Sequence, residues 1–229
     1  MSTQSISLDR PGQSVVGTIC DFAELTKPRI AVMVLIVVAV SMHIASFGQA
    51  NPWLVLQAML GTLGFAGSAC AVNHWLESIP DRLMRRTQGR PLVIGRLSNV
   101  QALLFAGLLF LMGVLVMAWA VNLSALFWGI ATWSLYVFVY TPLKTRTVAN
   151  TAIGAIAGAL PIFIGWSAAD ASLDYRAWSL FTVVFLWQFP HFMAIAWLYR
   201  KDYSNAGFQM LTTIDPSGRR AGVQAVLAA

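Results

Sequence analysis

Apolar stretches of about 20 residues alternate with short polar segments along almost the whole chain. A helix of that length crosses a hydrocarbon core of about 30 Å, so each stretch predicts a membrane span. No stretch shows the apolar–polar alternation of a barrel strand, and a helix satisfies its own backbone in lipid. The predicted fold class is therefore all-α, a polytopic transmembrane helical bundle. The predicted spans are 30–48, 52–76, 99–119, 123–141, 148–167 and 178–198.

The two ends of the chain differ from this pattern. Residues 1–24 have no apolar core of their own and predict a mobile cytoplasmic arm, followed by a membrane domain at 25–229. The last segment, "AGVQAVLAA" at 221–229, resembles the start of a seventh span but is too short to cross a bilayer. We expect either a truncated chain or a piece that docks at the interface, and truncation is the favoured interpretation.

Composition and charge exclude a soluble fold and set the orientation. Hydrophobic residues make up 58% of the chain and charged residues 10%, against about 25% charged in soluble domains. If the N-terminus is cytoplasmic, every lysine and arginine except Arg176 falls on the cytoplasmic side. This topology explains the net charge of +6 without nucleic acid as a partner. The acidic N-terminal arm is unlike a mitochondrial leader, which favours the bacterial inner membrane over the mitochondrial one.

One charged segment, "NHWLESIPDRLMRRTQGRPL" at 73–92, interrupts the apolar pattern. Asn73, Glu77 and Asp81 recur at four-residue intervals and would share one face of a helix, with Pro80 breaking that helix before Asp81. Mg²⁺ takes oxygen ligands, usually one or two carboxylates together with substrate phosphate. The neighbouring arginines match phosphate oxygens, so the segment predicts a metal–diphosphate site. A basic loop that only sets topology remains an alternative.

Two further segments carry polar side chains to the same membrane face. "YTPLKTRT" at 140–147 contributes phenol and basic groups, and "YRKDYSNAG" at 199–207 adds an acid between basic residues and tyrosines. Snorkelling basic residues and belt tyrosines would explain each segment singly. Their joint occurrence with residues 73–92 favours one polar site built from three loops.

These segments resemble three signatures of the UbiA-type intramembrane prenyltransferases. The matching stretches are "NxxxExxxDxxMxRTxxRPL" with "GRLS", "YTPLKTRTVANTAIGAIAGALPIFIGW" at 140–166 and "FLWQFPHFMAIAWLYRKDYSNAGFQML" at 185–211. The likeness is strongest to the members that farnesylate haem. It implies a bundle of about nine helices, of which this chain supplies six and the start of a seventh. It also implies transfer of a farnesyl group from farnesyl diphosphate to a vinyl group of haem B, giving haem O for terminal oxidases.

The resemblance also implies roles for individual residues. Mg²⁺ would be held by Asn73, Glu77, Asp81 and Asp202. The diphosphate would be bound by Arg85, Arg86, Arg90, Lys144, Arg146 and Lys201. The haem acceptor would contact His191, Tyr140 and Asn150. Polar residues in spans usually face the bundle interior, which is expected of His191, and a hydrogen-bonded packing histidine beside Pro190 is the alternative to contact with haem. The chain departs from the family pattern at Glu77, where Asp is common, at Ser78-Ile79-Pro80, and at Ala206, where the wider superfamily has a second acid.

Two other functions are compatible with these features. One is a prenyltransferase of the same superfamily that acts on an aromatic quinone precursor. The other, of a different class, is a secondary transporter that handles anions. Transporters place ionisable groups near the membrane midplane, whereas the acids here lie at the cytoplasmic rim, which favours the enzyme. The expected partners are farnesyl diphosphate, haem B and membrane lipid, with contact to haem A synthase or oxidase assembly factors.

Overall fold

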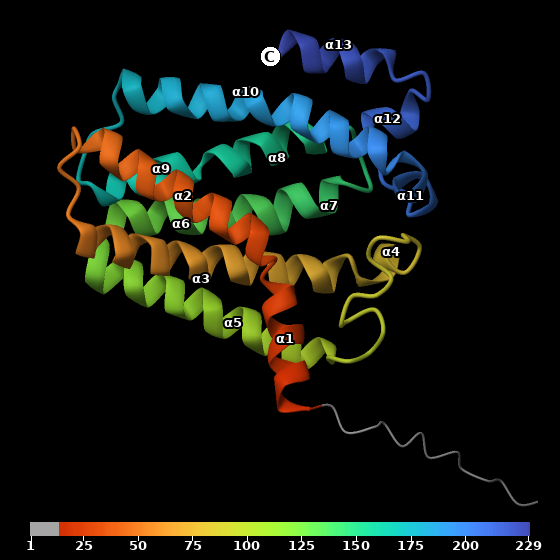
Figure 1. Cartoon of the computed structure of the whole chain (residues 1–229), viewed down its shortest axis with the longest axis horizontal. Coiled ribbons are helices and arrows are strands. Elements are labelled where there is room, and N and C mark those ends of the chain that lie inside the picture. Colours follow the sequence, from red (N-terminus) through yellow and green to blue (C-terminus); the bar gives the residue numbers. More distant parts are fainter. Residues whose placement is uncertain (1–13) are drawn as a thin grey trace, which may run out of the picture.

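The computed structural model describes residues 14–229, which form a bundle of helices without a strand. The apolar helices run side by side along the long axis of the molecule (Figure 1). Six of them are long and apolar enough to cross a membrane, as the sequence predicts. The largest discrepancy is three residues and occurs twice: the first span ends at Ala45 rather than at 48, and the sixth begins at Tyr175 rather than at 178. The spans are α2 Pro28–Ala45, α3 Pro52–Leu76, α5 Asn99–Val116 with η1 Met117–Val121, α6 Leu123–Ser134 with η2 Leu135–Tyr140 and α7 Thr141–Leu143, α8 Asn150–Ala159 with α9 Pro161–Ala168, and α10 Tyr175–Leu198.

Local sequence signals set where several of these helices begin. Asn51 precedes α3, and its side chain accepts a hydrogen bond from the backbone N–H of Trp53 at 2.9 Å. Pro52 then occupies the first turn, where its missing N–H has no consequence. Pro161 likewise begins α9, so the span predicted as one helix at 148–167 is two helices joined at Leu160.

Close packing around α3 and α9 organises the bundle. α3 packs against α5 and α2, α9 packs against α2 and α6, and α8 packs against α10. At Gly64, an added Cβ atom would lie 2.6 Å from the carbonyl oxygen of Leu109 and 2.7 Å from the nitrogen of Gly113. The backbones of α3 and α5 therefore touch at a point that only glycine permits.

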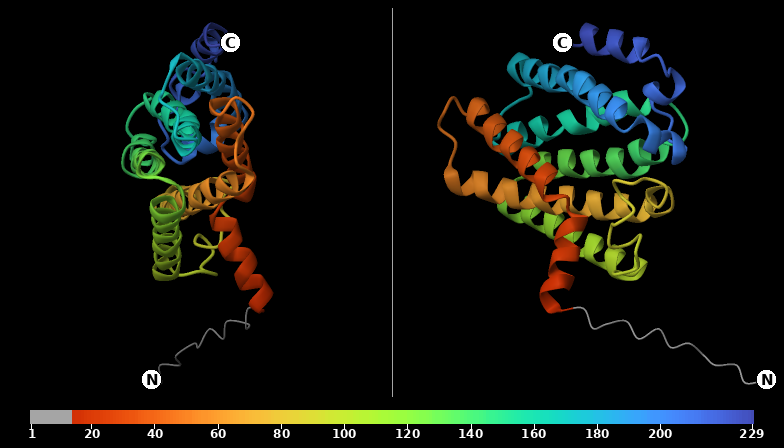
Figure 2. Two further views of the ribbon diagram at one scale, coloured as in Figure 1. Left: turned by 90° about the vertical axis from the view of Figure 1, so that its left-hand side faces the viewer. Right: turned by 45° about the vertical axis from the view of Figure 1, so that its right-hand side comes forward.

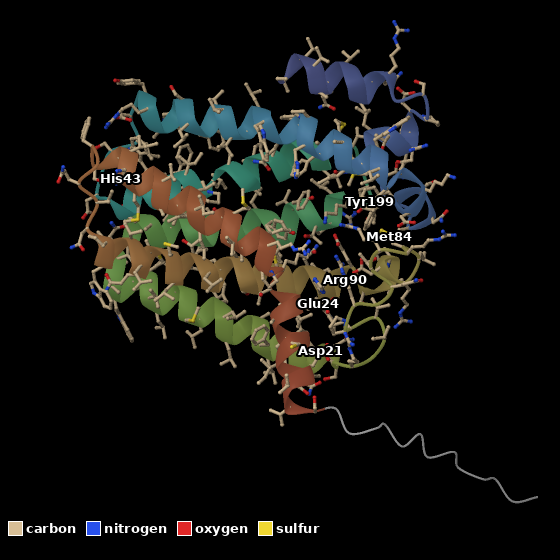
Figure 3. All side chains as sticks on the ribbon, in the orientation of Figure 1. Asp21, Glu24, His43, Met84, Arg90 and Tyr199 are labelled. Atoms are coloured by element: carbon tan, nitrogen blue, oxygen red, sulfur yellow. The ribbon has the colours of Figure 1, made fainter. Side chains whose placement is uncertain are left out.

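Polar contacts fasten the end of the bundle at which α10 begins. The Asp174 carboxylate accepts hydrogen bonds from the backbone N–H groups of Arg176 and Ala177, capping α10. The Arg176 side chain donates to Asp174 at 2.8 Å and lies over the Phe47 ring at 4.1 Å. His43 lies at this same end (Figure 3).

The two terminal helices lie at opposite edges of the bundle (Figure 2). Helix α1 (Val15–Leu25) projects from the bundle, and an ion pair between Arg96 and Asp21 at 2.9 Å holds it there. This helix falls within the predicted N-terminal arm, and the predicted mobility of residues 1–13 lies outside the described residues. At the other edge, α13 (Arg219–Leu227) packs against α10.

Candidate functional site

Three loop regions that are distant in sequence meet at one end of the bundle. The short helices α4 (Ser78–Asp81), α11 (Arg200–Asn205) and α12 (Leu211–Ile214) all lie there (Figure 1). Met84, Arg90 and Tyr199 also lie at this end, opposite His43 (Figure 3). This arrangement agrees with the expectation of one polar site built from residues 73–92, 140–147 and 199–207.

The three oxygen-bearing residues of the first loop are buried. Asn73 lies in the last turn of α3, Glu77 follows the end of that helix, and Asp81 closes α4. Their exposed fractions are 0% for Asn73, 6% for Glu77 and 0% for Asp81. The helix breaks at Glu77 rather than at Pro80, which lies inside α4. The predicted change of direction before Asp81 is therefore present, three residues earlier than expected.

Each of these three side chains contacts a cation from another part of the chain. The Lys27 Nζ atom donates to Asn73 Oδ1 at 2.6 Å, and the Lys144 Nζ atom donates to Glu77 Oε1 at 2.6 Å. Arg90 forms an ion pair with Asp81 through Oδ2. The other carboxylate oxygen of Asp81, Oδ1, is buried and has no hydrogen-bond partner among the described residues.

All of these side chains except Asn73 line a cavity of about 80 Å³. Two of the predicted metal ligands and four other predicted site residues reach it. The lining also includes three apolar side chains and two polar residues that the sequence analysis did not assign. The lining residues are Lys27, Glu77, Asp81, Met84, Arg86, Arg90, Tyr140, Lys144, Tyr203, Phe208 and Met210.

The electrostatics of the cavity keep one ion pair fully charged. Burial acts to lower the pKa of Lys144, but the Glu77 carboxylate raises it above its ordinary value. Burial acts to raise the pKa of Glu77, and the charges of Lys144 and Lys27 bring it below its ordinary value. Burial dominates at Asp81, where it raises the pKa, and at Lys27, where it lowers the pKa to about 8.

The cationic residues predicted to bind diphosphate divide into two groups. Arg86, Arg90 and Lys144 line the cavity, and the Arg86 guanidinium also lies 4.8 Å from the centroid of the Tyr199 ring. Arg85, Arg146 and Lys201 are exposed and do not line the cavity. Tyr140 does line it, with the Lys144 Nζ atom 4.6 Å from the centroid of its ring.

Asp202 is half-buried on α11 and does not line this cavity. Its neighbour Tyr203 is buried and does. The side chain that α11 contributes to the cavity is therefore a phenol rather than the predicted carboxylate.

Two residues predicted to contact the acceptor have other surroundings. The Asn150 amide donates to the carbonyl oxygens of Thr147 at 2.6 Å and Gln209 at 2.8 Å, which joins two loops. His191 is exposed, so the expectation that it faces the bundle interior is wrong. Its ring stacks on Trp187, one turn earlier on α10, with centroids 5.1 Å apart. The buried polar position on this part of α10 belongs to Gln188, which donates to the Ala155 carbonyl at 3.0 Å.

Lys27 is the main site residue that the sequence analysis missed. It was counted only as a basic residue of the cytoplasmic face, yet its side chain reaches the cavity and contacts Asn73. Its backbone has φ 49° and ψ 67°, the left-handed region, directly before Pro28 begins α2. A lysine next to a proline at the start of a span was the one available signal.

The cavity combines anion-binding and cation-binding groups. Lys27, Arg86, Arg90 and Lys144 present positive charge that matches phosphate oxygens. Glu77 and Asp81 offer carboxylate oxygens, and no cluster of three or more His, Cys, Asp or Glu side chains suited to a metal occurs in residues 14–229. A divalent ion at this cavity would need further oxygen ligands from a bound phosphate group.

Comparison with known proteins identifies a family. The sequence model of the UbiA prenyltransferase family matches residues 34–229. A protoheme IX farnesyltransferase from Rhodopirellula baltica is 48% identical over 207 residues, which cover 89% of this chain and 71% of that protein. Another protein of that name, from Solibacter usitatus, is 41% identical over 217 residues, covering 90% of this chain and 74% of its own.

Solved structures show the same fold. A UbiA homolog from Archaeoglobus fulgidus bound to DMAPP and Mg²⁺ superposes with a TM-score of 0.76 at 18% identity, over 91% of this chain and 73% of that chain. A digeranylgeranylglyceryl phosphate synthase gives a TM-score of 0.73 at 16% identity, over 92% and 74%. Together with the six apolar helices, these matches show that the chain is an integral membrane protein of the UbiA prenyltransferase family.

Proposed function

We propose that this protein transfers a farnesyl group from farnesyl diphosphate to a vinyl group of haem B, producing haem O. The observation that carries the proposal is the identity of 48% and 41%, over most of the chain, to two proteins named protoheme IX farnesyltransferase. A quinone-precursor acceptor would require the same diphosphate chemistry, so the choice of haem depends on these relatives.

The residues present fit a magnesium–diphosphate complex. Asp81 Oδ1 is a buried carboxylate oxygen without a partner among the described residues, on a side chain that lines the cavity. Glu77 lines the same cavity, and Asn73 lies one turn before Glu77. Asn73, Glu77 and Asp81 would hold Mg²⁺, directly or through water. The ion, when bound, would neutralise charge that develops on the leaving diphosphate.

The chain's own cations contribute the same kind of stabilisation. Arg86, Arg90 and Lys144 would bind diphosphate oxygens and orient the allylic carbon toward the acceptor. When the carbon–oxygen bond breaks, its electron pair leaves with the diphosphate, and the vinyl π electrons form the new carbon–carbon bond. This bond leaves a cation on the second vinyl carbon, where one water molecule adds and loses a proton to give the hydroxyl group of haem O. Water must be kept from the allylic cation until the new bond has formed, because that cation reacts with water. Met84, Phe208 and Met210 supply apolar lining at the cavity.

We further propose that this end of the bundle faces the cytoplasm of a bacterial cell. The supporting observation is the concentration of lysine and arginine at the loops on this side, with Arg176 at the other end. Asp202 remains a candidate metal ligand and His191 a candidate contact of the acceptor. Neither residue lines the cavity described above.

Haem chromatography tests the proposed function. A host that lacks its own synthase would express the wild type, Asp81→Asn and the control Asp170→Asn, with equal protein levels verified by immunoblot. Asp170 lies at the opposite end of the bundle, beside Asn122, and asparagine tolerates its left-handed backbone. We expect haem O with the wild type and the control, and about 100-fold less with Asp81→Asn. Equal amounts of haem O from all three proteins would show that the reaction does not need Asp81. A prenylated quinone precursor in the absence of haem O would show that the acceptor is the quinone precursor.

A further inference from the structure

The three candidate metal ligands of the first loop each contact a different cation. Asn73, Glu77 and Asp81 follow one another at four-residue spacing, and Lys27, Lys144 and Arg90 contact them in that order. The cations come from three segments: the residue before α2, the residue after α7, and the loop between α4 and α5. Protein cations thus contact one oxygen atom of each candidate ligand, and Asp81 Oδ1 has no hydrogen-bond partner among the described residues.

The cation contacts border the cavity that the substrate group would enter. Lys27, Glu77, Asp81, Arg90 and Lys144 all line this cavity, whose volume is about 80 Å³. A metal ion that binds the carboxylates and a diphosphate that binds the cations therefore compete with the contacts already present.

Neither ligand alone can satisfy the groups that it separates. A divalent ion bound by Glu77 and Asp81 would leave Lys144 and Arg90 without their partners in a buried site and would repel both. A diphosphate bound by Lys144 and Arg90 would leave two buried carboxylates unpaired and next to a polyanion. An uncompensated buried charge is strongly unfavourable. When both ligands bind, the carboxylates turn to the metal and the cations turn to the phosphates, so every charge has a partner.

We infer that Lys27, Arg90 and Lys144 are exchangeable counter-cations, which occupy the metal ligands in the resting site and transfer to the diphosphate when metal and diphosphate bind together. This inference rests on the proposed function, since it takes the diphosphate as the ligand. It adds Lys27 to the diphosphate-binding residues, and it makes the binding of the two ligands mutually dependent.

Calorimetry on the purified full chain in detergent tests this dependence, with Mg²⁺ and inorganic pyrophosphate as probes. The association of Mg²⁺ with pyrophosphate in protein-free buffer is measured first and subtracted. For the wild type we then expect Mg²⁺ affinity to rise about 100-fold when pyrophosphate is present, and pyrophosphate affinity to rise by the same factor with Mg²⁺, because the coupling is reciprocal. Equal Mg²⁺ affinity with and without pyrophosphate would overturn the inference.

Variants locate the effect in the named residues. Lys144→Met frees Glu77, so Mg²⁺ alone should bind at least about 10-fold more tightly than to the wild type. Lys27→Met frees the neutral Asn73 and should act in the same direction with less effect on folding, and it carries the test if Lys144→Met is not folded by circular dichroism. Arg29→Met, an exposed cation two residues from Lys27, is the matched control and should behave as the wild type. Unchanged Mg²⁺ affinity in a folded Lys27→Met or Lys144→Met protein would contradict the inference.

The outcomes separate this inference from the proposed function. Haem O production with independent binding of Mg²⁺ and pyrophosphate would refute the exchange and leave the function standing. Mutually dependent binding without haem O would do the reverse. Failure of pyrophosphate to bind even with Mg²⁺ would overturn the exchange, and the haem assay would still decide the proposed function.

Discussion

Lys144 and Glu77 form a buried ion pair that joins the end of α7 to the end of α3, with 2.6 Å between Nζ and Oε1. The side chains are 11% and 8% exposed, so water screens the pair only weakly. The contact links two helical segments as well as two chemical groups, and it therefore influences both stability and ligand binding.

Removing one partner of this pair should destabilise the protein more than removing both. Lys144→Met leaves the Glu77 carboxylate buried without its cation, which we expect to cost about 3–5 kcal/mol. The double variant Lys144→Met/Glu77→Gln removes both charges and should recover most of that loss. Thermal unfolding in detergent, followed by tryptophan fluorescence, measures the difference. A double variant as unstable as the single one would show that the loss of stability does not come from the unpaired Glu77 carboxylate.

The contact between α3 and α5 predicts that alanine at Gly64 destabilises the protein severely and that alanine at Gly107 does not. Gly64→Ala would place a methyl group 2.6 Å from the Leu109 carbonyl oxygen, so the two backbones must separate. Gly107→Ala, on α5, meets nothing within 4 Å and should be neutral or stabilising by about 0.5–1 kcal/mol. We expect loss of folded Gly64→Ala protein on size-exclusion chromatography, while Gly107→Ala elutes as the wild type. A well-folded Gly64→Ala protein with an unchanged melting temperature would refute the contact.

Asp174 should stabilise the far end of the bundle in a pH-dependent way. Desolvation acts to raise the pKa of Asp174, but hydrogen bonds from Arg176 and Ala177 bring it below 3.8. Because the native pKa is lowered, this stabilisation is present above about pH 4 and is lost as the pH falls through the native pKa. Asp174→Ala should therefore melt at a lower temperature than the wild type at pH 7, with a smaller difference below pH 4.

Asp174→Asn is the matched control for this experiment. Its amide oxygen can still cap α10, although it cannot pair with Arg176, so its melting temperature should fall between those of the wild type and Asp174→Ala. A difference between wild type and Asp174→Ala that stays constant from pH 7 to pH 3 would contradict the ionic contribution.

Asn150 should act by joining two loops rather than by contacting the acceptor. Its amide donates to Thr147 and Gln209, and the Gln209 N–H in turn donates to the Lys144 carbonyl oxygen at 2.7 Å. Asn150→Ala should increase hydrogen–deuterium exchange at residues 205–210 and lower pyrophosphate affinity in the presence of Mg²⁺. Thr151→Ala, which removes only a long 3.4 Å hydrogen bond to Asn150, is the control. Unchanged exchange in Asn150→Ala would favour the direct role in acceptor binding.

The sequence predicts the features that depend on local patterns. Span lengths follow from apolar stretches, and the four-residue spacing of Asn73, Glu77 and Asp81 indicates that they act together, although their burial is known only from the structure. Contacts between distant segments were not predictable in this way. Lys27 reaches Asn73 because of how α2 packs beside α3, and no local pattern encodes that distance.

The rotation of α10 about its axis was also beyond the sequence pattern. Gln188 and His191 are both polar residues in this span, and only one of them is buried. The Gln188 side chain finds a carbonyl acceptor on α8, at Ala155, whereas His191 stacks on Trp187. Which polar residue of α10 finds a hydrogen-bond partner depends on the neighbouring helix. The expectation that polar residues in spans face the bundle interior therefore holds for Gln188 and fails for His191.

The π-helical turn η2 has a consequence for how this membrane segment can vary. A π turn accommodates one residue more than an α turn, and the backbone N–H of Thr141 accordingly donates to the carbonyl of Tyr136, five residues earlier. Because one π turn with its extra residue covers about the same rotation and rise as one α turn, deleting one residue within 135–140 would let the segment continue as an ordinary α-helix with Lys144 kept in place. The segment should thus accept a deletion here, whereas a deletion in the ordinary α-helix at 123–134 would rotate every following side chain by about 100° around the axis.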